Sequence, residues 1–247
     1  MKNLFKQNAV FLTLSLMLAV ALGLALLCIP KGELHLLLCD RHTPARDIFY
    51  MYYTRVAEWF PYVICVALLL FSRIGDGVLA TACMALSGLA TQGLKYAADT
   101  DRPLKWFADN MPDVTLPLVE GVRMSKFYSF PSGHTTSFFA LAFVLCILYT
   151  GYAGKSGNTG NSGNSGNSGN SGKSSNLKQR TFSNLIQMGL FFLAALGGYS
   201  RIYLSQHFTS DVAGGIVVGI LISILCYVFF SRYNGQKWYN YRLFTKK

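Results

Sequence analysis

Three clusters of polar residues in this 247-residue chain stand at the ends of long apolar runs. They consist of Lys95 and Arg102; of Pro131-Ser132-Gly133-His134; and of Ser200-Arg201, His207 and Asp211. Ionisable side chains beside apolar runs are costly to keep in a membrane and are functional candidates by default. These clusters are therefore the first place to look for chemistry.

Three of the clustered residues are cations that could surround a phosphate. Lys95, Arg102 and Arg201 each lie near the end of an apolar run, and Pro103 pushes Arg102 out of helical geometry. Gly133 opens another run, where helix N–H groups favour anions and a glycine permits close approach. Three cations beside a helix N-terminus predict a phosphate-binding site.

Two histidines accompany these cations. His207 and Asp211 are four residues apart, so on a helix or at its start they share a face. A carboxylate bonded to one imidazole nitrogen fixes the tautomer and leaves the other nitrogen free to attack. His134 comes from a different run and could protonate a leaving oxygen as a general acid. The set predicts phosphoryl transfer through a phosphohistidine, with no cofactor and no metal.

Each piece also has a structural interpretation. A single Lys or Arg near the end of a span is usually an anchor at the membrane surface, and Pro-Ser-Gly is a common turn before a helix. A histidine four residues before an aspartate also occurs by chance. These interpretations do not explain why all three clusters fall at span ends on one predicted side of a membrane, and this coincidence favours the catalytic interpretation.

The composition identifies the elements that must position these residues. Hydrophobic residues make up 52% of the chain and charged residues only 13%, which is too few charges for a water-soluble surface. Six apolar runs approach the roughly 20 residues that span a bilayer. They are residues 11–29, 56–72, 78–98, 135–152, 185–204 and 212–230. We predict an all-α, six-span transmembrane helix bundle that forms a single domain, residues 1–247.

The charges predict the orientation of this bundle. The first run is too long for a signal peptide and lacks a small-residue cleavage site, so we interpret it as an uncleaved span. Six spans place both termini on one side, which holds twelve of the 22 Lys and Arg residues. These are Lys2, Lys6, Arg73, Lys155, Lys173, Lys178, Arg180, Arg232, Lys237, Arg242, Lys246 and Lys247.

The same side has one acid, Asp76, and so carries the whole net charge of +11. Basic residues favour the cytoplasm, which predicts cytoplasmic termini and an active site that faces the periplasm across the inner membrane. The basic residues are spread over membrane flanks rather than gathered in one domain, which argues against a nucleic-acid partner. The expected partners are the bilayer and a lipid substrate.

Residues 156–172 repeat Ser-Gly-Asn with a glycine at every third position. Such a polar, glycine-rich segment cannot bury enough apolar surface to fold. We predict a flexible cytoplasmic loop over residues 153–181 that carries no chemistry.

The ordered pattern of the three clusters resembles the three-part signature of the type 2 phosphatidic acid phosphatase superfamily, and no position departs from it. The resemblance implies a membrane bundle whose active site lies at its outer face. It implies His207 as the nucleophile, Asp211 as its partner and His134 as the acid. The phosphate ligands that it implies are Lys95, Arg102, Ser132, Gly133 and Arg201.

The substrate is predicted from residues outside the signature. Residues 33–59 are similar to bacterial lipid A phosphatases, which favours a phosphate of lipid A. Undecaprenyl pyrophosphate and phosphatidylglycerol phosphate are the alternatives within the same superfamily. From a different class, an anion transporter or an inactive phosphate-lipid binder would also contain cations. A transporter would place them near the midplane, and an inactive binder would be expected to lack His134 or His207.

Two further histidines, His35 and His42, lie outside the signature in the first outer loop. We expect them on the loop surface rather than in catalysis. The pairs Gly197-Gly198 and Gly214-Gly215, together with Gly219, indicate close packing between helices.

Overall fold

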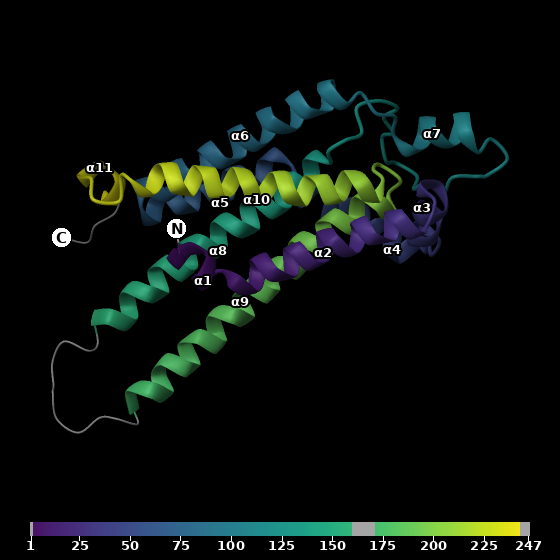
Figure 1. The fold of residues 1–247 in the computed structure, drawn as a ribbon. Coiled ribbons are helices and arrows are strands. Elements are labelled where there is room, and N and C mark those ends of the chain that lie inside the picture. The colour runs from purple at the N-terminus through teal and green to yellow at the C-terminus, as the bar shows by residue number, and fades with distance from the viewer. Residues whose placement is uncertain (1, 160–170, 243–247) are drawn as a thin grey trace.

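The computed structural model describes residues 2–159 and 171–242, and all of the regular structure in these residues is helical (Figure 1). The helices are α1 (Lys2–Gln7), α2 (Ala9–Cys28), α3 (Lys31–Cys39), α4 (Pro44–Tyr53), the 3₁₀ helix η1 (Thr54–Ala57), α5 (Trp59–Ser72), α6 (Ile74–Ala98), α7 (Pro103–Asn110), α8 (Gly133–Thr159), α9 (Ser171–Tyr203), α10 (Thr209–Ser231) and α11 (Lys237–Asn240). The predicted all-α membrane bundle is confirmed.

Five helices of the described chain are long and apolar enough to cross a membrane. They are α2, α6 together with α7, α8, α9 and α10, and they cover five of the six apolar runs. The remaining run, residues 56–72, does not form one continuous helix. Residues 44–57 and 60–72 form two helical segments bent by 46° relative to each other, and taken together they make a sixth candidate span. Pro61 accounts for the break, since it has no N–H to donate to a carbonyl in the preceding turn.

Helix α8 is the centre of the bundle. It packs against α6, α9 and α10, and 67% of its span is buried, whereas 11% of the span of α2 is buried. Phe11 of α2 stacks on Phe143 of α8, with ring centroids 5.4 Å apart. Because α8 begins at Gly133, the central helix also carries one of the polar clusters.

Glycines allow α10 to lie close to α8. A Cβ on Gly215 would come within 2.8 Å of the Ser132 carbonyl oxygen, and one on Gly219 within 2.6 Å of the Thr136 carbonyl oxygen. The third cluster, which leads into α10, is therefore held against the second cluster at the start of α8.

Replacing Gly219 by alanine should test this packing. The new Cβ would meet backbone atoms of Thr136 and Ala140, which cannot rotate away. We expect the free energy of unfolding to fall by about 1–3 kcal/mol, the usual cost of overpacking. Gly189→Ala on α9 is the matched control, because a Cβ there meets no atom within 4 Å. Equal melting temperatures of the two variants in detergent would contradict the packing argument.

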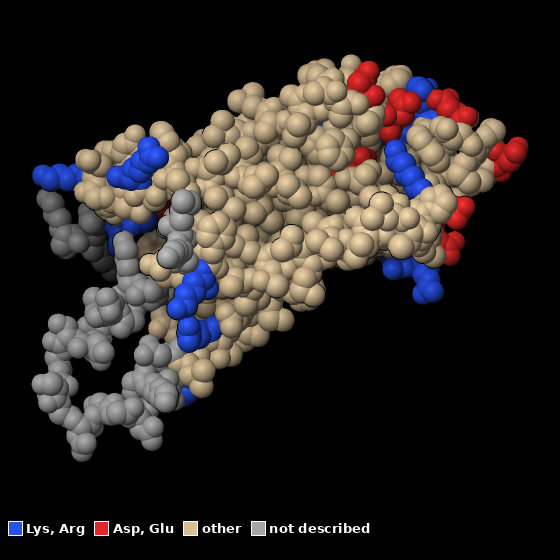
Figure 2. All heavy atoms as spheres, viewed as in Figure 1, with Lys and Arg blue, Asp and Glu red and all other residues tan. Residues whose placement is uncertain are grey.

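The two ends of the bundle differ in charge. Helix α2 begins and α10 ends at the end where both chain termini are marked, as six spans require (Figure 1). At this end Thr150 of α8 donates a hydrogen bond to Asn8, 3.2 Å away. The visible acidic side chains gather at the opposite end, around α3 and α7 (Figure 2). The polar clusters lie at this opposite end.

The predicted loop over residues 153–181 differs in part from the structure. Helices α8 and α9 include residues 153–159 and 171–181, since a helix that is already nucleated gains one hydrogen bond for each added residue. The centre of the predicted loop, residues 160–170, lies outside the described residues.

Candidate active site

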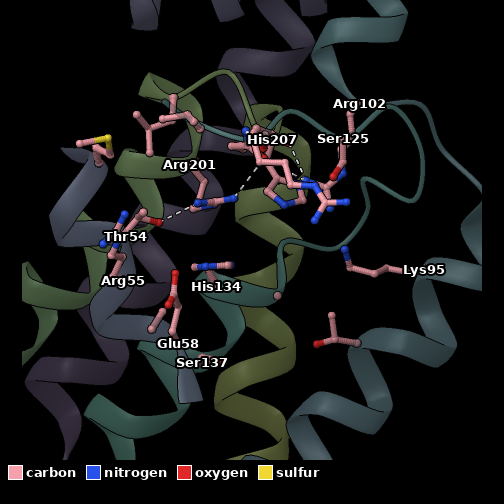
Figure 3. Close-up of a pocket in the computed structure, with 18 of the residues that line it drawn as sticks. Thr54, Arg55, Glu58, Lys95, Arg102, Ser125, His134, Ser137, Arg201 and His207 are labelled. Atoms are coloured by element: carbon pink, nitrogen blue, oxygen red, sulfur yellow. Dashed lines mark hydrogen bonds between the residues drawn. The ribbon is translucent and has the colours of Figure 1, made fainter. Parts of the chain in front are cut away.

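A cavity of about 660 Å³ opens at the acidic end of the bundle and brings the three clusters together (Figure 3). Its walls come from η1, α6, the start of α8, and the turn between α9 and α10. Six of the predicted residues line it: Lys95, Arg102, Gly133, His134, Arg201 and His207. The two others, Ser132 and Asp211, lie buried behind the wall.

His207 is held from behind by a carboxylate. Its Nδ1 lies 3.4 Å from Oδ2 of Asp211, and its side chain is buried. The same carboxylate oxygen accepts hydrogen bonds from the Ser129 hydroxyl at 2.5 Å and from the Phe208 N–H at 2.9 Å. Oδ2 of Asp211 is therefore held by three groups, and Nε2, the opposite nitrogen of His207, is left on the cavity side.

The surroundings keep His207 neutral. Burial lowers the pKa of His207 to about 3; the bond to Asp211 opposes this shift, and the charge of Arg102 adds to it. An uncharged imidazole with Nδ1–H directed at the carboxylate has a free lone pair on Nε2. The ring is therefore in the form that a nucleophile needs at neutral pH.

Two arginines are fixed by polar groups around the cavity. Nη1 of Arg201 donates to the Thr54 hydroxyl at 2.7 Å, and Nη2 lies 3.4 Å from the Gln206 side-chain oxygen. Nε of Arg102 donates to the Phe127 carbonyl at 3.0 Å, and Nη1 lies 3.4 Å from the same Gln206 oxygen. Gln206 thus holds the two guanidinium groups together despite their like charge.

Lys95, the third predicted cation, lies on another wall of the cavity (Figure 3). Its Nζ donates to the Tyr128 carbonyl at 3.0 Å. Asp99, in the left-handed region at φ 40°, ends α6, and extended backbone at Arg102 precedes the short helix α7. This geometry agrees with the expectation that Pro103 keeps Arg102 out of the helix.

The start of α8 supplies the remaining donors. The first N–H groups of a helix have no partner within it, and Gly133 and His134 line the cavity there. A Cβ on Gly133 would meet only Thr91, at an ordinary 3.6 Å. The protein itself does not require a glycine at this position, so the free space is available to a ligand.

Ser132 has a different place from the one expected of a phosphate ligand. Its hydroxyl accepts hydrogen bonds from the Thr135 hydroxyl at 2.9 Å and the Thr135 N–H at 3.4 Å, and it is fully buried. Its own N–H donates to the Asp211 carbonyl at 2.9 Å. Ser132 therefore caps α8 and ties it to α10, while Gly133 and His134 face the cavity.

The structure also corrects the expectation for His35. This residue is completely buried rather than on the loop surface, and its Nε2 lies 3.3 Å from the Ser205 hydroxyl behind the His207 turn. Burial lowers the pKa of His35 to about 4, so the ring is neutral. Its ring packs on Phe208 with centroids 5.2 Å apart. The burial of His35 could have been predicted from the apolar residues around it in α3, because they indicate a helix with a buried face.

Sequence reasoning missed several residues of the site. Thr54, Arg55 and Glu58 come from the broken second span, and Gln206 adjoins His207. Ser129, three residues before Ser132, donates a hydrogen bond to Asp211. Only Gln206 had a sequence signal, its position next to a candidate nucleophile. Among the described residues, no group of three or more His, Cys, Asp or Glu side chains could hold a metal ion.

The geometry defines a multi-pass membrane protein with a cationic, histidine-containing pocket at one end of its helices. The profile of the PAP2 superfamily matches residues 76–234, which include all three clusters, and the chain belongs to this superfamily. It is therefore a membrane phosphatase by family. No curated protein matches the chain.

Two solved structures share the fold. The crystal structure of Aquifex aeolicus LpxE aligns with a TM-score of 0.56 and 23% identity, over 80% of this chain and 94% of that one. The first transmembrane PAP2 type phosphatidylglycerolphosphate phosphatase from Bacillus subtilis aligns with a TM-score of 0.51 and 22% identity, over 94% of this chain and 100% of that one.

Proposed function

We propose that the protein hydrolyses the phosphate of a membrane lipid through a phosphohistidine on His207, without a metal ion. The observation that carries this proposal is the position of His207 between a fixed carboxylate, Asp211, and a cavity whose lining includes the three predicted cations. His134 lines the same cavity from another helix. A phosphate bound in this cavity would therefore have a nucleophile, a general acid and stabilising positive charges around it.

In the first step Nε2 of His207 attacks phosphorus, and the bond from phosphorus to the lipid oxygen breaks. His134 gives its proton to this oxygen as the lipid alcohol leaves. In the second step water attacks the phosphohistidine and the phosphorus–nitrogen bond breaks. The proton of the water passes to His134, and inorganic phosphate leaves. Lys95, Arg102, Arg201 and the first N–H groups of α8 neutralise the charge on the phosphoryl oxygens in both steps.

We propose a phosphate of lipid A as the substrate, because residues 33–59 resemble bacterial lipid A phosphatases. Undecaprenyl pyrophosphate and phosphatidylglycerol phosphate are the alternatives, the latter also named for the Bacillus subtilis neighbour. Turnover of these lipids by the purified protein, compared as kcat/KM, tests the choice. Failure to hydrolyse any of them would contradict the proposed function.

We further propose that the cavity faces the periplasm from the inner membrane, with both termini in the cytoplasm, because the basic surplus lies at the end that holds the termini. The position of the cations also argues against an anion transporter. They gather at one end of the bundle, whereas a transporter places its site near the midplane.

Removal of divalent metal tests the chemistry. Three cations already supply the charge that a metal ion would supply, so we expect the purified protein to keep its activity in EDTA. Vanadate should inhibit it, because vanadate adopts the five-coordinate geometry of the phosphoryl transition state. An activity that disappears in EDTA and returns with Mg²⁺ would overturn the metal-independent mechanism.

A further inference from the structure

The cavity continues along α6 beyond the phosphate ligands. Lys95 lies near the outer end of α6, and the same cavity is lined by Thr91, Gly88 and Ser87. Ser87 is eight residues before Lys95, which places it about 12 Å deeper along the helix. The phosphate ligands therefore occupy only the outer part of the cavity, and a second compartment lies below them.

Two hydroxyl groups in this lower compartment lack a strong hydrogen-bond partner. Oγ of Ser87 and Oγ1 of Thr91 are buried, with their residues 2% and 5% exposed. Thr91 has no partner in the described part of the chain, and Ser87 has there only the thiol of Cys83, one turn away, which is a weak partner. Ser15 and Thr209 also lack partners among the described residues, but they lie outside the cavity lining. A buried hydroxyl without a strong partner is costly, and two of them four residues apart on one face of a cavity indicate a ligand site.

The opposite wall adds an acceptor. Glu58, at the break in the second span, lines the cavity at the level of His134, and Ser137 lies below it on α8 (Figure 3). Non-helical backbone at membrane depth is tolerated where it lines a polar cavity, so the break itself fits this compartment. Among the described residues that line the cavity, Glu58 is the one acid. Its carboxylate repels a second phosphate and accepts hydrogen bonds from hydroxyl or amide groups.

Space is available between these groups. A Cβ added to Gly88 would meet no atom within 4 Å. The cavity of about 660 Å³ is of the size that holds a small-molecule ligand rather than a phosphate alone. The compartment is therefore open as well as polar.

We propose that the lower compartment, formed by Ser87, Thr91 and Glu58, binds an uncharged, hydroxyl-bearing group to which the phosphate is attached, such as the sugar of a phosphorylated glycolipid. The inference rests on the proposed phosphatase function and adds a specificity subsite to it. A lipid whose phosphate is joined directly to an isoprenoid chain, or to a glycerol with both hydroxyls esterified, offers Glu58 no donor. Such lipids gain nothing from this subsite.

The test compares Ser87→Ala, Thr91→Val and the double variant of the full chain on three substrates. These are a glucosamine-based glycolipid phosphate, phosphatidic acid, and an aryl phosphate that has no lipid group. We expect the ratio of glycolipid to aryl phosphate kcat/KM to fall about three- to tenfold for each single variant, the range of one hydrogen bond. The ratio of phosphatidic acid to aryl phosphate should stay constant. Thr81→Val is the matched control on the same helix, since its hydroxyl bonds within α6 and lies outside the cavity lining.

Gly88→Leu provides a second test that does not depend on hydrogen bonds. The larger side chain enters the compartment, and we expect the glycolipid ratio to fall more than in either hydroxyl variant. Unchanged glycolipid ratios in all variants would overturn the subsite, and so would equal losses on all three substrates. In both cases the wild-type protein would still hydrolyse lipid phosphate, and the proposed function would stand. If the wild-type protein hydrolyses none of the three, and neither undecaprenyl pyrophosphate nor phosphatidylglycerol phosphate, the proposed function fails, and the subsite fails with it. Hydrolysis of undecaprenyl pyrophosphate alone would overturn the subsite and leave the proposed function standing.

Discussion

Replacement of His207 by alanine is expected to abolish both turnover and the phosphoenzyme. Nε2 of His207 faces the cavity. The other histidine that lines the cavity is His134, and it makes no hydrogen bond to a carboxylate among the described residues. No second activated nucleophile is therefore available there. Loss of a nucleophile typically leaves only the catalysis that binding and charge stabilisation provide. The measurement is single-turnover reaction with radiolabelled lipid phosphate, followed by rapid quench under conditions that preserve phosphohistidine.

Asp211→Asn is the companion variant. The amide keeps the size of the carboxylate and leaves His207 in place. It removes the negative charge that orients the imidazole and that stabilises the positive charge developing on the ring during attack. We expect turnover to fall by about 10²–10⁴-fold, less than in His207→Ala, with the phosphoenzyme still detectable. Wild-type turnover in Asp211→Asn would contradict the assigned pair.

His42→Ala provides a histidine control for both variants. His42 pairs with Asp47 at 2.9 Å and stacks on Tyr203, outside the cavity lining. Its loss should leave the phosphoenzyme intact. A phosphoenzyme that persists in His207→Ala would assign the nucleophile to another residue.

The sequence predicted those parts of the site that lie at the ends of apolar runs. Lys95 and Arg201 stand where helices leave the bilayer, and the four-residue spacing of His207 and Asp211 expresses a local geometry that any helix start would produce. The six runs were visible because a bilayer requires a minimum apolar length. Each of these predictions depends on local information.

The residues that were missed depend on contacts between distant segments. Thr54 reaches Arg201 across 147 positions, and His35 reaches Ser205 across 170. A local sequence pattern does not predict which loop will pack against which helix. Ser132 was assigned to the phosphate because its motif resembles a ligand set, but its hydroxyl is used in capping α8. To distinguish a phosphate ligand from a helix cap, one must know where the side chain points, and sequence spacing does not give this direction.

His134→Ala should lose activity to an extent that depends on the leaving group. If His134 protonates the lipid oxygen, the variant lacks general acid catalysis, and turnover of a lipid alkoxide should fall by about 10²–10⁴-fold. An activated aryl phosphate leaves with little need of a proton, so much of the loss should disappear with that substrate. The measurement is kcat for both substrates in the wild-type protein and the variant.

The phosphoenzyme separates this role from that of a nucleophile. His134 comes from the first turn of α8, whereas His207 comes from the turn between α9 and α10 (Figure 3), so the two can act on opposite sides of one phosphorus atom. With the aryl substrate, His134→Ala should still form phosphohistidine, because attack by His207 does not require the acid. Equal losses on both substrates would indicate that His134 binds phosphate rather than donates a proton. If His134→Ala loses the phosphoenzyme while His207→Ala keeps it, the two roles are reversed, and the carboxylate behind His207 positions an acid instead of a nucleophile.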